Sequence, residues 1–252
     1  MSDHNQVVQR QFGEQATAYL NSTVHAQGPE FALLQAAVAG QTDARVLDLG
    51  CGAGHVSFHL APLVGEVLAY DLSPQMLEVV ARNAEARGLG NIRTECGAAE
   101  SLPFADASFD FVFSRFSAHH WSDLGRALRE VRRVLKPGAV AAFIDVSAPG
   151  LPLLDTHLQT VEVLRDSSHV RDYSATEWLG MLGAAGLQVT AHSRQRLRIE
   201  FASWVERMRT PEVFRAAILA LQAAVGEEVR DYFEIERDGS FSFDVLVLWA
   251  GR

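Results

Sequence analysis

The chain has 252 residues, of which 48% are hydrophobic and 21% charged, a composition typical of a globular protein with a full core. Its formal net charge of −9 argues against a nucleic-acid partner. No apolar run approaches the roughly 20 residues of a membrane-spanning helix. The polar start "MSDHNQVVQRQ" predicts no signal peptide, and two cysteines are too few for a disulfide framework, so we expect a cytoplasmic protein.

The first half of the chain opens with two expected helices and then alternates short apolar runs with helical segments. The expected helices cover residues 6–20, 29–39, 56–63 and 74–87, and the expected strands 45–50, 66–72, 92–97 and 109–115. The helix over 74–87 has clear boundary signals: Ser73 as N-cap, Pro74 in the first turn and Gly88 as the stop.

A further helix is expected over 123–135, ended by Pro137 and Gly138, before a strand over 139–146. The remaining segments are a mixed stretch over 149–173, a helix over 174–186, a β-prone stretch over 187–200, a largely helical stretch over 201–235 and a final strand over 240–250. Strands without period-two alternation, separated by helices, indicate a parallel sheet covered on both faces.

Three glycines, Gly50, Gly52 and Gly54, lie between the first core strand and its helix. Glycine costs conformational entropy, so this clustering indicates that a ligand presses against the backbone at a helix N-terminus. The dinucleotide fingerprint G-x-G-x-x-G is not met, because its third glycine would fall on His55 or Ser57. A plain tight turn remains the alternative.

Asp71 ends the second core strand, about twenty residues after Gly50. In a parallel sheet its carboxylate would lie at the carboxyl edge beside the glycine loop, where it could accept hydrogen bonds from two ribose hydroxyls. Capping the next helix is the alternative role, but Ser73 already fills it. The two features together predict a nucleoside-binding crevice.

Five motifs in order, "VLDLGCGAG", "YDLSPQML", "AAESLPF", "FDFVFSRFSAHHW" and "LREVRRVLKPGA", resemble the class I S-adenosylmethionine-dependent methyltransferases. The likeness is greatest to the methyltransferase type 11 group, which includes the ubiquinone/menaquinone-biosynthesis C-methyltransferases, and it covers about residues 45–146. It implies an α/β fold with a doubly wound, mostly parallel, seven-stranded Rossmann-like sheet, a C-terminal antiparallel strand and helical cover segments. We expect one domain, with a helical cover over 1–40, a cofactor-binding core over 41–148, and a substrate-side cover with the last strands over 149–252.

The resemblance implies that S-adenosyl-L-methionine is the cofactor. The residues it implies around the cofactor are Asp48, Gly50, Cys51, Gly52, Asp71, Leu72, Met76, Ala98, Ala99, Glu100, Ser114 and Arg115. The glycine loop would face the methionine part, with Asp48 behind it ordering the loop or a water. Asp71 would hold the ribose, and Leu72 and Met76 would flank the adenine.

One position departs from the family pattern. Where the family often has an aspartate that accepts from the adenine amino group, this chain has Ala98, which leaves the backbone at Ala99, or Glu100 nearby, to read the base. Backbone at Ser114 or Arg115 would take the cofactor's amino group. Cys51 is not expected to act as a nucleophile, since small residues are usual in such loops.

Aromatic and polar residues near the carboxyl edge are candidates for the substrate side. Aromatic faces suit a sulfonium ion, which makes Phe12, Tyr19 and Phe116 candidates for the pocket wall, with core packing as the alternative. His169 and Tyr173, on the 149–173 segment, are candidate substrate contacts, with a solvated loop as the alternative.

His119 and His120 follow the fourth core strand, where a base would be needed for a phenol, alcohol or enolisable carbon. Helix capping or packing is the alternative role for both. Asp145 closes the fifth strand and could face the substrate. No set of Cys, His or Asp has the spacing of metal ligands, so no metal is expected.

We therefore expect a methyltransferase that acts on a small molecule by direct in-line transfer. Methylation of a macromolecule, tRNA or protein, and cofactor binding without transfer are the alternatives. The oligomeric state is not predicted.

Overall fold

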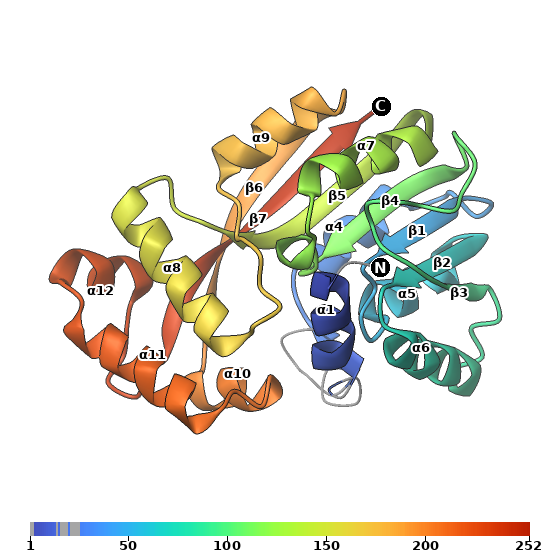
Figure 1. The fold of residues 1–252 in the computed structure, drawn as a ribbon. Helices are drawn as coiled ribbons and strands as arrows, with labels where there is room; N and C mark the ends of the chain where they lie inside the picture. The colour runs from blue at the N-terminus through green and yellow to red at the C-terminus, as the bar shows by residue number, and fades with distance from the viewer. Residues whose placement is uncertain (1–2, 14, 16–19, 21–25) are drawn as a thin grey trace.

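The computed structural model describes residues 3–13, 15, 20 and 26–252 (Figure 1). Within this part of the chain the strands form a seven-stranded sheet in the order β3-β2-β1-β4-β5-β7-β6. Strands β1 to β5 pair in parallel, whereas β7 pairs antiparallel with both β5 and β6. The predicted fold class, including the antiparallel C-terminal strand, is therefore confirmed.

The inner strands of the sheet are largely apolar because both of their faces are covered, whereas the two edge strands are mostly exposed. The strand bounds are β1 (Arg45–Leu49), β2 (Glu66–Asp71), β3 (Ile92–Cys96), β4 (Phe109–Arg115), β5 (Leu135–Ser147), β6 (Gln188–Ile199) and β7 (Phe241–Gly251). In β1, Val46 packs into one hydrophobic cluster and the next residue, Leu47, into another on the opposite face. This removes the polar alternation that a half-exposed strand would show.

Helices cover both faces of the sheet (Figure 1). Their bounds are α1 (Asp3–Gly13), α4 (Glu30–Ala37), α5 (His55–Leu60), α6 (Pro74–Ala86), α7 (Leu124–Val134), α8 (Pro152–Arg165), α9 (Ala175–Ala184), α10 (Phe201–Arg207), α11 (Glu212–Ala224) and α12 (Glu227–Phe233), with 3-10 turns η1 (Ala61–Leu63) and η2 (Ala118–His120). Apolar residues of α4, α5 and α6 belong to one cluster and those of α7 and α9 to the other. Helix α6 begins as predicted, with the Ser73 hydroxyl accepting from the Met76 N–H.

Three expected elements differ from the structure. Helix α7 ends at Val134, close to the predicted end at Leu135, but β5 begins at Leu135 and not at residue 139, because Leu135 already pairs with Phe109. The pairing register then shifts between Phe109 and Phe111, and such an irregularity tolerates a proline inside a strand. The stretch 149–173 contains the regular helix α8, and α1 begins at Asp3, earlier than expected.

The N-terminal helix α1 and most helices of the C-terminal half lie together near one end of the sheet (Figure 1). In Figure 1, α8, α10, α11 and α12 gather beyond one end of the sheet, and α1 lies between them and α6. Side chains of α1 reach both neighbours: Gln9 donates to the Leu72 carbonyl at 2.8 Å and Gln11 to the Met208 carbonyl at 3.3 Å. Among the described helices, none is long and apolar enough to cross a bilayer.

Candidate functional site

The glycine loop lies where the strand order reverses, between β1 and β4, which is the usual ligand position of open α/β sheets. Gly50 has φ +71°, and a Cβ on it would lie 1.9 Å from the Ser117 hydroxyl oxygen. Gly52 has φ +50°, and a Cβ there would meet no described atom within 4 Å. The loop thus needs glycine for its conformation, and at Gly52 it faces open space.

Asp71 joins the ends of β1 and β2. Its Oδ2 accepts from the Gly52 N–H at 2.8 Å, and its Oδ1 accepts from the Ser73 N–H at 2.8 Å. Burial raises the pKa of Asp71, and these backbone hydrogen bonds oppose the rise. Each oxygen keeps a second lone pair that can accept from a ligand hydroxyl.

Asp48 contacts the helix that follows the glycine loop, and not the loop as expected. Its Oδ2 accepts from both the N–H and the hydroxyl of Ser57, at 2.9 and 2.6 Å, so it holds the first turn of α5 and not the glycine loop itself. Burial raises the pKa of Asp48 to about 7. Burial also raises the pKa of the neighbouring Cys51 thiol well above its usual range, which keeps the thiol protonated and a poor nucleophile.

A cavity of about 960 Å³, including its opening to solvent, lies over this loop. The predicted cofactor and substrate residues that line it are Phe12, Asp48, Gly50, Cys51, Gly52, Asp71, Leu72, Met76, Ala98, Ala99, Glu100, Arg115, Phe116 and His120. Ser114 is buried and does not line it. Tyr19 lies outside the described residues.

Arg115 and Glu100 are already engaged by other parts of the chain. The Arg115 guanidinium pairs with buried Glu30 of α4 at 2.6 Å and lies over the rings of Phe31 and Phe116. Glu100 accepts from the Ser122 hydroxyl at 2.8 Å, which braces the turn before α7. Both side chains therefore line the cavity while bonded to other parts of the chain.

Helix α1 supplies a wall of the cavity that the sequence motifs do not indicate. Asn5, Val8 and Phe12 line the cavity from this helix. Its His4 ring Nε2 lies 2.9 Å from the His120 carbonyl oxygen, and Phe12 packs edge-on against the His120 ring. The helix thus closes one side of the site against the η2 turn.

A second cavity, of about 510 Å³ including its opening to solvent, adjoins the first and shares Phe12, Phe116 and His120 with it. One part of its wall is apolar, from Val146, Leu197, Ile199, Trp204 and Phe243; the other part is polar, from His119, Glu162, Arg165 and Arg207. Most of these residues come after residue 146, beyond the five sequence motifs. The apolar spacing of Leu154, Leu158 and Val161 is the sequence signal that could have predicted a buried helix, α8, in this part of the chain.

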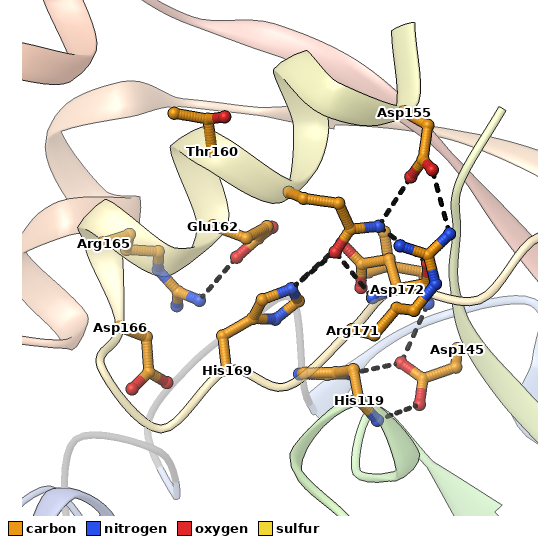
Figure 2. A network of polar contacts seen from close by, with 12 residues as sticks. His119, Asp145, Asp155, Thr160, Glu162, Arg165, Asp166, His169, Arg171 and Asp172 are labelled. Atoms are coloured by element: carbon orange, nitrogen blue, oxygen red, sulfur yellow. Dashed lines mark hydrogen bonds and ion pairs between the residues drawn. The ribbon is translucent and has the colours of Figure 1, made fainter. Parts of the chain in front are cut away.

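The two adjacent histidines have different partners. His119 Nδ1 lies 2.6 Å from Asp145 Oδ1 (Figure 2). Burial alone would lower the pKa of His119, but the charge and hydrogen bond of Asp145 raise it to about 9. Burial and the neighbouring charge of His119 lower the pKa of His120, whose Nδ1 donates to the Ser168 carbonyl at 3.1 Å.

A buried polar layer of α8 and the loop after it supports this pair (Figure 2). The Arg165 guanidinium lies 3.5 Å from Glu162 and donates to the Trp204 carbonyl at 3.2 Å. His169 bonds Gln159 at 2.9 Å and lines neither cavity. Tyr173 packs near Trp178 and also lines neither cavity, so these two predicted substrate contacts are structural in the observed arrangement.

The residues of the first cavity fit a sulfonium nucleoside. Asp71 presents a carboxylate at the strand end, Gly52 leaves room beside it, and buried Met76 offers an apolar contact. Arg115 is neutralised by Glu30, so the cavity does not place an unpaired cation against a positive ligand. Geometry and chemistry define a nucleoside-cofactor site on a doubly wound α/β fold.

Comparison with known proteins shows the family. A methyltransferase domain matches residues 47–143. YcgJ of Bacillus subtilis, an uncharacterised methyltransferase, is 37% identical over 222 residues, covering 88% of each chain, and its crystal structure superposes with a TM-score of 0.83 over 88% of this chain and 97% of that one. The chain belongs to the S-adenosylmethionine-dependent methyltransferases, in the type 11 group.

Of two further relatives, one has no activity in its name and the other is named for a methyltransferase reaction. YafE of Escherichia coli, an uncharacterised protein, is 52% identical over 203 residues, which cover 81% of this chain and 98% of YafE. Demethylmenaquinone methyltransferase of Chlorobaculum parvum is 36% identical over 118 residues, covering 46% of this chain and 47% of that enzyme. The match to the second relative spans less than half of either chain.

Proposed function

We propose that the protein transfers a methyl group from S-adenosylmethionine to a small-molecule acceptor held in the second cavity. One observation supports this most directly: the two cavities share Phe12, Phe116 and His120, so a molecule in the second lies against a molecule in the first. The second cavity combines an apolar wall with a few polar groups, as small-molecule sites do.

When bound, the cofactor supplies a methyl group already activated by the positive sulfur. The chain's own residues bind and orient it. Asp71 accepts from the ribose hydroxyls, Leu72 and Met76 flank the base, and the backbone at Ala99 reads its edge. The loop over 50–54 holds the amino-acid end. These roles are supported by the position of each residue on the wall of the first cavity.

The residues between the cavities orient the acceptor and exclude water. Phe12 comes from α1 and Phe116 directly follows β4, so the two elements each place one aromatic ring at the junction. Alignment of two reactants contributes about 7–11 kcal/mol in favourable cases. The named activity of the demethylmenaquinone methyltransferase relative supports a small acceptor of this kind.

A labelled-cofactor screen tests the proposal. The purified protein is incubated with methyl-labelled S-adenosylmethionine and cell extract that has passed a filter excluding macromolecules, and the products are separated by mass spectrometry. We expect a labelled small molecule. Label only in the retained RNA or protein would instead support a macromolecular acceptor, and cofactor binding without any labelled product would support a binding protein.

A pair of matched variants connects the screen to the second cavity. Val146→Phe fills this cavity, whereas Val163→Phe makes the same change at an exposed position of α8. We expect Val146→Phe to lose most turnover while its affinity for S-adenosylhomocysteine changes less than about twofold, because the first cavity is untouched. Equal turnover in both variants would contradict the placement of the acceptor.

A further inference from the structure

Three basic side chains from separate elements converge on the second cavity. His119 lies in η2, Arg165 is the last residue of α8 and Arg207 the last of α10, and all three line the wall. Among the described residues, Glu162 is the one acid on that wall. Burial raises the pKa of Glu162, and each of the three basic groups opposes that rise. Their charges therefore act at one place.

His119 is a charged hydrogen-bond donor on this wall. Its Nδ1 lies 2.6 Å from Asp145 Oδ1, and Asp145 Oδ2 accepts from the His119 backbone N–H at 3.3 Å (Figure 2). Burial opposes protonation of the ring, but Asp145 outweighs it and brings the pKa of His119 to about 9, so the ring is protonated at neutral pH. A protonated ring has no lone pair to take up a proton, and Nε2–H can only donate. No described residue accepts from Nε2.

The Arg165 guanidinium also has donors without an acceptor among the described residues. Its Nε donates to the Trp204 carbonyl at 3.2 Å, and its Nη1 lies 3.5 Å from Glu162 (Figure 2). The guanidinium carbon lies 5.0 Å from the centre of the Trp204 ring, which holds the group against the apolar wall. The two N–H donors of Nη2 have no described partner and are available to a ligand.

The other acids near these cations lie behind the wall. Asp145, Asp166 and Asp172 do not line the cavity. Asp145 pairs with His119, and Asp166 lies 4.0 Å from the His120 ring. Burial raises the pKa of Asp172 well above its usual range, which favours its neutral form, and burial lowers the pKa of His120 to about 4, so that ring is also neutral at pH 7. At this pH the cavity faces three cations and one acid.

We propose that the second cavity binds an acceptor that combines a compact apolar body with a single carboxylate. The carboxylate accepts hydrogen bonds from His119 and Arg165 and faces the positive charge of Arg207, and Ile199 and Trp204 contact the body. This inference rests on the proposed methyltransferase function, because it names the class of acceptor for the same site.

The charges on the wall favour one negative charge over the other possibilities. Charged N–H donors form strong hydrogen bonds with a carboxylate, and a low local dielectric strengthens them. A neutral acceptor would leave the three cations facing a partly dry space with only Glu162 to balance them. A cationic acceptor would meet three like charges. A dianion would place its second charge near Glu162 and Asp145, which oppose it.

Matched probes test the class of acceptor on the protein loaded with S-adenosylhomocysteine. Benzoate and 4-butylbenzoate carry the carboxylate, their two amides are neutral counterparts, phenyl phosphate is a dianion and benzylamine a cation. We expect 4-butylbenzoate to bind at least about tenfold more tightly than its amide, because charged hydrogen bonds are stronger than neutral ones. Failure of both benzoates to bind, equal binding of acid and amide, or tighter binding of phenyl phosphate or benzylamine would overturn the proposal.

Arg207→Gln and Arg194→Gln compare a cation of the cavity with one outside it. The Arg194 side chain is 61% exposed on β6 and does not line the cavity. We expect Arg207→Gln to weaken 4-butylbenzoate by at least about fivefold and its amide by less than about twofold, whereas Arg194→Gln should leave both within about twofold. Equal effects of the two variants on the acid would contradict the placement of the carboxylate.

A measurement on the wild-type protein avoids any effect of a substitution on folding. In a nuclear magnetic resonance spectrum of the histidine rings, the Nε2 signal of His119 should move when 4-butylbenzoate is added. The ring of His192, which is exposed on β6, should not respond. An unchanged His119 signal at saturating 4-butylbenzoate would overturn the site.

The outcomes separate this inference from the function on which it rests. Probe binding is measured without methyl transfer, and the labelled-extract screen detects a product of any charge. A labelled neutral small molecule, with no preference for acid over amide, would overturn the carboxylate class and leave the methyltransferase proposal standing. A clear preference for the acid, with no labelled small molecule in the screen, would instead overturn the proposed transfer and leave an anion-binding cavity.

Discussion

The backbone N–H of Gly52 donates to Oδ2 of Asp71 at 2.8 Å, which connects the loop after β1 to the end of β2. This one contact joins the two features that define the cofactor crevice. Gly52 leaves open space in front of the backbone, and Asp71 places its carboxylate at the side of that space. A change at either residue therefore affects both the shape and the chemistry of the site.

Asp71→Ala should weaken S-adenosylmethionine binding by at least about tenfold, because charged hydrogen bonds contribute about 1.5–3 kcal/mol each. Calorimetry on the folded variant measures the loss. Glu95→Ala, an exposed acid on the next strand, is the control and should bind normally. Wild-type affinity in a folded Asp71→Ala protein would contradict the role of this residue.

Gly50→Ala should abolish measurable cofactor binding. The new Cβ would lie 1.9 Å from the Ser117 hydroxyl oxygen at a residue with φ +71°, so the loop must move. Gly40→Ala is the control, since Gly40 has a similar φ of +77° but no described atom within 4 Å of the added Cβ. If both variants bind the cofactor equally, the loop geometry is not what limits binding.

Asp48→Asn should stabilise the cofactor-free protein at neutral pH. The folded-state pKa of about 7 is above the ordinary value of 3.8, so Asp48 favours folding most below pH 4 and loses this contribution as the pH rises to 7. The variant avoids that loss, and its advantage should grow across this range to at most about 4 kcal/mol. Urea unfolding at pH 4, 5.5 and 7.5 measures it.

Asp110→Asn gives the opposite sign and serves as the comparison. Partial burial opposes ionisation of Asp110, but hydrogen bonds from the Arg45 N–H and Lys136 lower its pKa. Its stabilising contribution is present above the ordinary pKa and is lost as the pH falls, so the variant should be less stable at pH 7.5 and equal at low pH. A stability difference independent of pH in both variants would contradict these assignments.

Glu30→Ala should cost about 3–5 kcal/mol of unfolding free energy, because it leaves the buried guanidinium of Arg115 without its carboxylate. The two side chains are 5% and 6% exposed and hold α4 against the end of β4. Glu236→Ala breaks the exposed ion pair with Arg198 and should change stability little. Chemical denaturation of both variants gives the comparison, and similar losses would contradict the importance of burial.

Local patterns in the chain determined most of the core. Largely apolar runs predicted β1, β2, β4 and the buried part of β5, because a strand buried on both faces has no regular polar alternation. Ser73, Pro74 and Gly88 predicted the ends of α6, since each acts through the backbone next to it. Gly52 and Asp71 were predicted to meet because successive parallel strands end at the same edge of a sheet.

Only the tertiary structure decided the acceptor side. His119 and Asp145 are 26 residues apart, and their contact depends on the pairing of β4 with β5 and on the turn after β4. The second cavity combines Phe12 with residues as distant in the sequence as Phe243. The predicted substrate contacts His169 and Tyr173 lie outside it, against Gln159 and Trp178. Short-range patterns report the state of the backbone, whereas a cavity wall depends on how distant elements pack, which no local spacing encodes.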